Sequence, residues 1–101
     1  MTRTLTATTS GLRLTSTGSF PTYATTGGTE DSQNKNYLSF GEFDGADNQD
    51  ISISLHIEGY SNTWNISVSH RIKWKGDTPH VTNTATLNGE NIPYDKITIT
   101  L

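Results

Sequence analysis

A chain of 101 residues with a formal net charge of −3 is long enough for one hydrophobic core and too short for two, so we expect a single domain over residues 1–101. The absence of cysteine excludes disulfides and thiolate metal sites, and the mildly acidic balance without a basic stripe argues against nucleic-acid binding. The first ten residues have no apolar segment and no apolar run reaches 18 residues, so neither a standard secretion signal nor a membrane span is expected.

Threonine dominates the beginning of the chain, where it alternates with other residues. Thr2, Thr4, Thr6 and Thr8 occupy every second position of 2–9, which predicts a strand with a polar outer face. We interpret this strand as one that adds to the sheet edge of a neighbouring subunit. A second strand follows the break at Ser10-Gly11, with Leu12 and Leu14 on one face.

Residues 18–36 form a long polar stretch that contains Pro21 and the pair Gly27-Gly28. This composition predicts a loop, and a loop of that length inside a small domain is typical of a partner-contacting segment. The next strand is predicted over 37–43, and an acidic turn follows it over 44–50.

The clearest pattern in the chain predicts a hairpin over residues 51–74. Alternate residues of 51–57 and of 64–74 are apolar, and a turn at 58–62 separates the two strands. Trp64 and Trp74 both fall on the apolar stripe and are expected in the core or an interface. His70 falls on that stripe too, whereas His56 falls on the polar face of its strand, so the two do not form a shared metal site.

Two further strands are predicted near the end of the chain, over 81–87 and 97–101, with Asn88-Gly89 as a tight-turn dipeptide between them. No segment has a helical apolar period. The chain is therefore predicted to be all-β, a single antiparallel β-sandwich or jelly roll of about seven to eight strands.

Oxygen-bearing side chains gather on the acidic turn. Asp44, Asp47 and Asp50 lie close enough in sequence to hold a calcium ion, which prefers oxygen ligands, although their spacing differs from that of an EF-hand loop. The alternative is a solvated acidic turn between two strands. Calcium is the one cofactor that the sequence suggests.

The sequence contains no arrangement typical of an enzyme: no nucleophile elbow, no zinc-binding helix motif and no phosphate-binding glycine loop. We therefore predict that the protein is not an enzyme.

Phe20, Tyr23, Tyr60 and Tyr94 fall in or beside predicted loops and turns. Tyrosines in such positions serve subunit contacts and carbohydrate stacking equally well, so these four residues are the predicted binding or interface set.

Residues 71–101 resemble the carboxy-terminal strand pair of many bacteriophage virion proteins, among them tail-fibre and receptor-binding domains. The matching residues are Lys73, Trp74, Gly76, Thr78, Pro79, Thr82, Asp95, Ile97 and Thr98. The sequence departs from the usual pattern at Lys75, where proline is common, and at Asp77, where a second glycine is common. The resemblance implies a structural protein located in the virion: a fibre tip, a baseplate piece or a capsid decoration protein.

The leading expectation is thus a non-enzymatic bacteriophage structural protein that contacts copies of itself or virion lattice neighbours. The alternative is a carbohydrate-binding module or lectin, in one version calcium-dependent. A fimbrial or surface-layer subunit is the third reading. Neither a nucleic acid nor a membrane is an expected partner.

Overall fold

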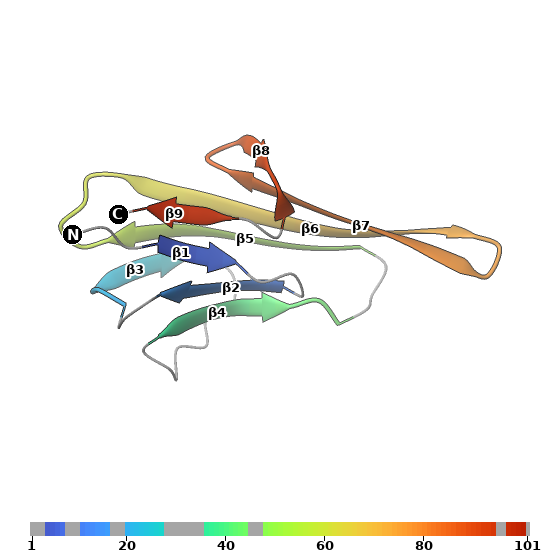
Figure 1. The fold of residues 1–101 in the computed structure, drawn as a ribbon, viewed down its shortest axis with the longest axis horizontal. Helices are drawn as coiled ribbons and strands as arrows, with labels where there is room; N and C mark the ends of the chain where they lie inside the picture. The colour runs from blue at the N-terminus through green and yellow to red at the C-terminus, as the bar shows by residue number, and fades with distance from the viewer. Residues whose placement is uncertain are drawn as a thin grey trace.

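The computed structural model describes residues 4–7, 11–16, 20–27, 36–44, 48–94 and 97–100. These residues fold almost entirely into antiparallel strands, as predicted, and the described part contains no helix (Figure 1). The strands are β1 (Thr4–Ala7), β2 (Gly11–Ser16), β3 (Tyr23–Thr26), β4 (Tyr37–Glu42), β5 (Asn48–Ile57), β6 (Thr63–Lys75), β7 (Thr78–Leu87), β8 (Glu90–Ile92) and β9 (Thr98–Thr100).

The strands form two sheets. The four-stranded sheet has the order β4-β2-β1-β9, and the five-stranded sheet has the order β3-β5-β6-β7-β8. One cluster of buried apolar side chains draws on both sheets. Its largest fully buried members are Leu12, Leu14, Leu38, Phe40, Leu55, Ile57, Ile66, Ile97, Ile99 and Val68. Alternate apolar positions of β2, β4, β5, β6 and β9 therefore supply most of the core.

The predicted hairpin over 51–74 is confirmed. β5 and β6 pair without a register shift, from Asn48 opposite Arg71 to His56 opposite Thr63. His70 is buried, with 9% of its surface exposed, while His56 is exposed, as the alternation predicts.

The prediction that residues 18–36 are entirely loop is wrong. Tyr23–Thr26 forms β3, which pairs with β5 and makes one edge of the five-stranded sheet. Four residues, two of them threonine, are too few to show a period in the sequence, and the strand forms through its pairing with β5. A short β8 after the Asn88-Gly89 turn also went unpredicted, so nine strands are described instead of seven to eight.

The interpretation of the threonine-rich first strand as a sheet-edge donor is also wrong. β1 lies inside its sheet, because it pairs with β2 on one side and with β9 on the other. Its backbone groups are used within the chain and are not available to a neighbouring subunit.

Two tight turns in the five-stranded sheet depend on residues that tolerate positive φ. Gly76 has φ of 61° at the first position of the two-residue β6–β7 turn, as a type II′ turn requires. Asn88 and Gly89 have φ of 51° and 85° in the β7–β8 turn, which is the pattern of type I′.

Candidate interaction site

The β6–β7 hairpin projects beyond the rest of the molecule and forms what we call the arm, residues 72–81 (Figure 1). β5 pairs with β6 only as far as Arg71, and β8 pairs with β7 only from Ala85. Among the described residues, the arm is therefore a two-stranded ribbon. It accounts for much of the elongation of the molecule, whose principal extents are 51 × 28 × 22 Å.

One face of the arm is apolar and continues the inner face of β6. The apolar stripe of this strand is buried at Trp64, Ile66 and Val68, then becomes partly exposed at Ile72. Trp74 is 55% exposed, and Val81, on the same face of the arm, is 54% exposed. A stripe that builds the core within the body therefore presents large apolar side chains to solvent on the arm.

The opposite face of the arm is basic. Lys73 and Lys75 alternate with the apolar residues of β6, and His80 lies directly opposite Lys73 on β7. Asp77, in the turn, is the only acidic residue of the arm. The arm thus has two chemically distinct faces, a combination that suits contact with an apolar surface bordered by carboxylates.

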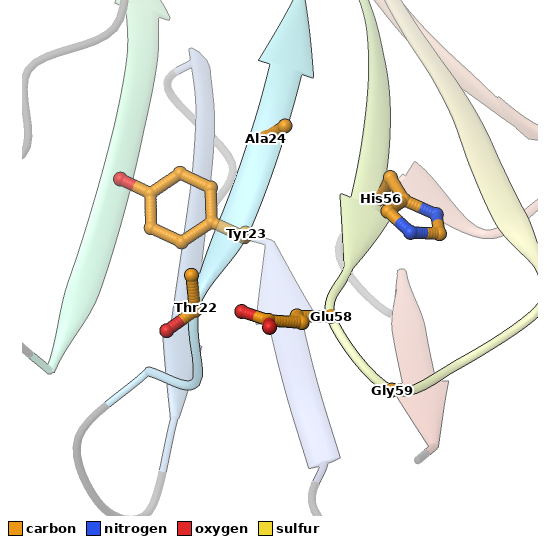
Figure 2. A pocket seen from close by; sticks show the side chains of 6 residues that line it. All are labelled: Thr22, Tyr23, Ala24, His56, Glu58 and Gly59. Carbon is orange, nitrogen blue, oxygen red and sulfur yellow. The ribbon is translucent and has the colours of Figure 1, made fainter.

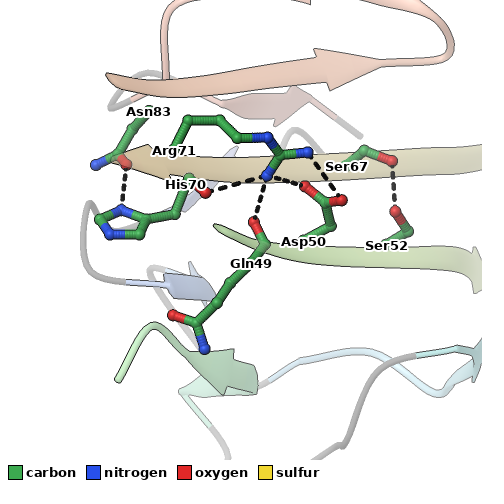
Figure 3. Close-up of polar contacts among 7 residues, drawn as sticks. All are labelled: Gln49, Asp50, Ser52, Ser67, His70, Arg71 and Asn83. Carbon is green, nitrogen blue, oxygen red and sulfur yellow. Dashed lines mark hydrogen bonds and ion pairs between the residues drawn. The ribbon is translucent and has the colours of Figure 1, made fainter. Parts of the chain in front are cut away.

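Polar contacts fix the base of the arm (Figure 3). The guanidinium of Arg71 lies 2.8 Å from a carboxylate oxygen of Asp50 and also donates to the backbone carbonyl of Gln49. The hydrogen bond from Arg71, with a smaller contribution from Ser69, lowers the pKa of Asp50 from its ordinary value. The same hydrogen bond raises the pKa of Arg71. This ion pair ties β6 to β5 at the last residues where the two strands pair.

A partly buried pair lies on the other face at the same level. His70 Nδ1 and Asn83 Oδ1 are 2.7 Å apart, and because an amide oxygen only accepts, the ring donates from Nδ1. His70 Nε2 is buried and has no hydrogen-bond partner among the described atoms. Phe43 stacks on the imidazole with ring centroids 4.9 Å apart. His70 is therefore a packing residue where the core ends and the arm begins.

A shallow open pocket of about 210 Å³ lies at the other end of β5, where this strand meets β3 (Figure 2). It is lined by Thr22, Tyr23, Ala24, His56, Glu58 and Gly59. The backbone N–H of Glu58 donates to the Thr22 carbonyl at 2.8 Å, which joins the two walls of the pocket. Ala24 provides apolar surface, and Glu58 provides an exposed carboxylate. The Tyr23 ring lies on the other face of β3, because Tyr23 pairs with buried Ile57 whereas Ala24 pairs with exposed His56 (Figure 2).

The four aromatic residues predicted to bind do not form one surface. Phe20 and Tyr23 contact each other edge to face, with centroids 6.2 Å apart, and Tyr23 lines the pocket. Tyr60 is 37% exposed in the adjacent β5–β6 turn and lies 6.4 Å from Trp64. Tyr94 lies elsewhere: it stacks near Phe43 and donates its hydroxyl to the Gly11 carbonyl at 3.3 Å. Burial raises the pKa of Tyr94, and the hydrogen bond to Gly11 partly offsets that rise.

The predicted calcium ligands are only partly described. Asp50 is engaged by Arg71, and the backbone N–H of Asp44 donates to Gln49 Oε1 at 3.1 Å. Asp47 lies outside the described residues. Within the described ranges, no group of three or more His, Asp or Glu side chains is arranged to hold a metal ion. The calcium site stays a prediction, which melting curves with and without EDTA test, since a bound ion stabilises the folded state.

Sequence reasoning missed the exposure of the arm and the pocket. A signal for the arm was present: the apolar alternation runs over 51–57 in the first strand of the hairpin but over 64–74 in the second. The second strand therefore extends beyond the first, and the first strand does not cover the last apolar residues of the second. The pocket had no such signal, because Thr22 and Ala24 were assigned to a loop.

Comparison of the chain with family models, curated proteins and solved structures gives no significant match. No helix in the described part of the chain is long and apolar enough to span a bilayer.

Proposed function

We propose that this chain is a structural, non-enzymatic subunit, a β-sandwich domain that assembles with its neighbours through the arm. The observation that carries the proposal is the exposure of Trp74 and Val81 on a hairpin that projects from the body. Isolated two-stranded ribbons are only marginally stable in water, so an arm of this kind gains most from contact with a partner.

The energetics favour assembly. A tryptophan side chain carries 150–250 Å² of surface, so covering the exposed half of Trp74 removes on the order of 100 Å² from water. At about 25 cal/mol per Å², this side chain alone contributes roughly 2–3 kcal/mol to a contact. The pocket at the other end of the molecule does not favour a small-molecule function instead, since its volume of about 210 Å³ is smaller than the ~300–1,000 Å³ of ordinary small-molecule sites.

The resemblance of residues 71–101 to bacteriophage virion proteins supports a virion as the assembly to which this subunit belongs. The arm falls inside the resembling segment, and Lys73, Trp74, Gly76 and Pro79 all belong to it. We therefore propose a virion as the assembly, with the protein as a fibre, baseplate or capsid decoration subunit. Its neighbours are other virion proteins or further copies of this chain.

Particle incorporation tests the proposal. The chain should be found in purified virions by mass spectrometry, and the double variant Trp74→Ser/Val81→Ser should be lost from them at least tenfold. Because both residues are more than half exposed, the double variant should melt within a few degrees of the parent chain. Wild-type incorporation of a folded double variant, or absence of the parent chain from particles, would contradict the proposal.

A further inference from the structure

The arm and the pocket lie at opposite ends of the molecule (Figure 1). His56 of the pocket pairs with Thr63 at the beginning of β6, and Lys75 ends the same strand. Twelve residue steps at about 3.3 Å each separate the two ends of β6, a distance of roughly 40 Å. The arm of one chain therefore cannot reach the pocket of the same chain, and any contact between them joins two molecules.

The pocket has the right size for one aromatic side chain. A closed cavity of about 150 Å³ admits a benzene ring, and the pocket is somewhat larger at about 210 Å³. Trp74 is the largest exposed apolar side chain of the described residues, and it is one residue from the turn that forms the tip of the arm. The arm tip also projects well beyond the rest of the molecule, so it can approach an open pocket on another copy ahead of the body (Figure 1).

The charges of the two ends are complementary. Lys73, Lys75 and Asp77 give the arm a formal charge of +1, so the rest of the chain carries −4 of the total of −3. Glu58 is exposed at the pocket, and the two lysines flank Trp74 in sequence. Approach of the arm to the pocket is therefore attractive, whereas approach of one arm to another brings like charges together.

We infer that the arm of one copy docks in the pocket of a second copy, with Trp74 against Ala24 and His56 and the flanking lysines near Glu58. This inference rests on the proposed assembly function and names both the partner and the receiving surface. The contact is heterologous, since different surfaces of the two copies meet. Repetition of such a contact produces a ring where the rotation closes and a filament where it does not.

Two complementary variants test this arrangement. Trp74→Ser/Val81→Ser removes the arm contact and leaves the pocket intact, while Ala24→Arg fills the pocket with a cationic side chain and leaves the arm intact. In sedimentation velocity, the parent chain should form oligomers larger than dimers. Each variant alone should lose association at least tenfold, and an equimolar mixture of the two should stop at a one-to-one dimer, because only one functional arm and one functional pocket can meet.

Each other result overturns the inference. If Ala24→Arg associates as the parent chain does, the arm docks elsewhere on the second copy. If the mixture gives no dimer although both variants melt like the parent, the arm and the pocket are not partners. Should Ala24→Arg lower the melting temperature, Glu58→Lys replaces it, since this exposed residue contributes no core packing.

A further outcome separates the inference from the proposed function. A parent chain that sediments as a monomer at every concentration, but enters particles in an arm-dependent way, overturns docking on a second copy. In that case the assembly function stands and the arm binds a different virion protein.

Discussion

At the scale of single residues, the base of the arm combines a partly buried polar pair with an exposed ion pair. His70 and Asn83 share a hydrogen bond of 2.7 Å on the inner face, and Asp50 and Arg71 meet on the outer face. The physical environment of each pair decides how much it contributes to stability. In the inner pair His70 is buried and Asn83 is half-buried, whereas the outer pair is about half exposed.

Removal of Asn83 should therefore be costly. In Asn83→Ala, His70 Nδ1 loses its acceptor while the ring stays buried, so we expect a loss of about 1–3 kcal/mol in the free energy of unfolding. Urea denaturation measures this loss. Thr84→Ala is the matched control, because Thr84 is the next residue of β7 and is exposed. Equal effects of the two substitutions would show that the hydrogen bond contributes little.

The ion pair predicts a dependence on pH instead. Because Arg71 lowers the pKa of Asp50 below its ordinary 3.8, the pair stabilises the fold above about pH 4 and stops doing so as pH falls through the lowered pKa. Asp50→Asn should lower the melting temperature slightly near neutral pH, since exposed pairs are screened by solvent, and the difference should shrink as pH falls through the lowered pKa of Asp50. A difference that persists at low pH would exclude the carboxylate charge as its cause.

At the scale of elements, β2 and β4 depend on a close approach of their backbones. A Cβ at Gly11 would lie 2.3 Å from the Gly41 carbonyl oxygen and 2.7 Å from the Glu42 Cα, beside a shift in the register of the two strands. Neither contact involves a flexible side chain that can move away. The absence of a side chain at Gly11 is thus a condition for this pairing.

Gly11→Ala should destabilise the protein by about 3 kcal/mol, the upper range of overpacking costs. Gly59→Ala is the control: a Cβ there meets nothing within 4 Å, so only the strain of positive φ remains, about 1 kcal/mol. Thermal denaturation of both variants measures the difference. If the two variants melt alike, the backbone approach at Gly11 is not limiting.

The elements also show how far the sequence leads. The pairing of β5 with β6 was predictable, because long runs of alternating apolar residues specify both the face and the register. β3 was not, because its four residues become a strand only through pairing with β5. The exposure of Trp74 was not predictable from its own strand, because its local pattern equals that of buried Trp64. The difference lies in the extent of the neighbouring strand, which shows only when the alternation over 51–57 is compared with that over 64–74.

At the scale of the whole molecule, the body is acidic and the arm is basic, so association between copies should depend on ionic strength. In about 1 M salt the Debye length falls to about 3 Å and the attraction of Lys73 and Lys75 toward Glu58 is screened. We expect the association constant to fall at least tenfold relative to low salt, as measured by sedimentation equilibrium. Stronger association in high salt would assign the contact to apolar burial alone.

Pro79 gives the arm a property that its side chains do not reveal. Lys75 and Thr78 flank the two-residue turn and exchange hydrogen bonds, so the backbone groups of the next pair, Trp74 and Pro79, point away from each other. On the outer edge of β7 the proline offers no N–H at that position, which interrupts the row of donors that an incoming strand would need.

Pro79→Thr should restore the row of backbone N–H donors and speed fibrillar aggregation, as followed by thioflavin fluorescence. An unchanged rate of aggregation would contradict this role of Pro79. A projecting hairpin with this blunted edge selects its partner by side-chain fit and resists indiscriminate sheet growth.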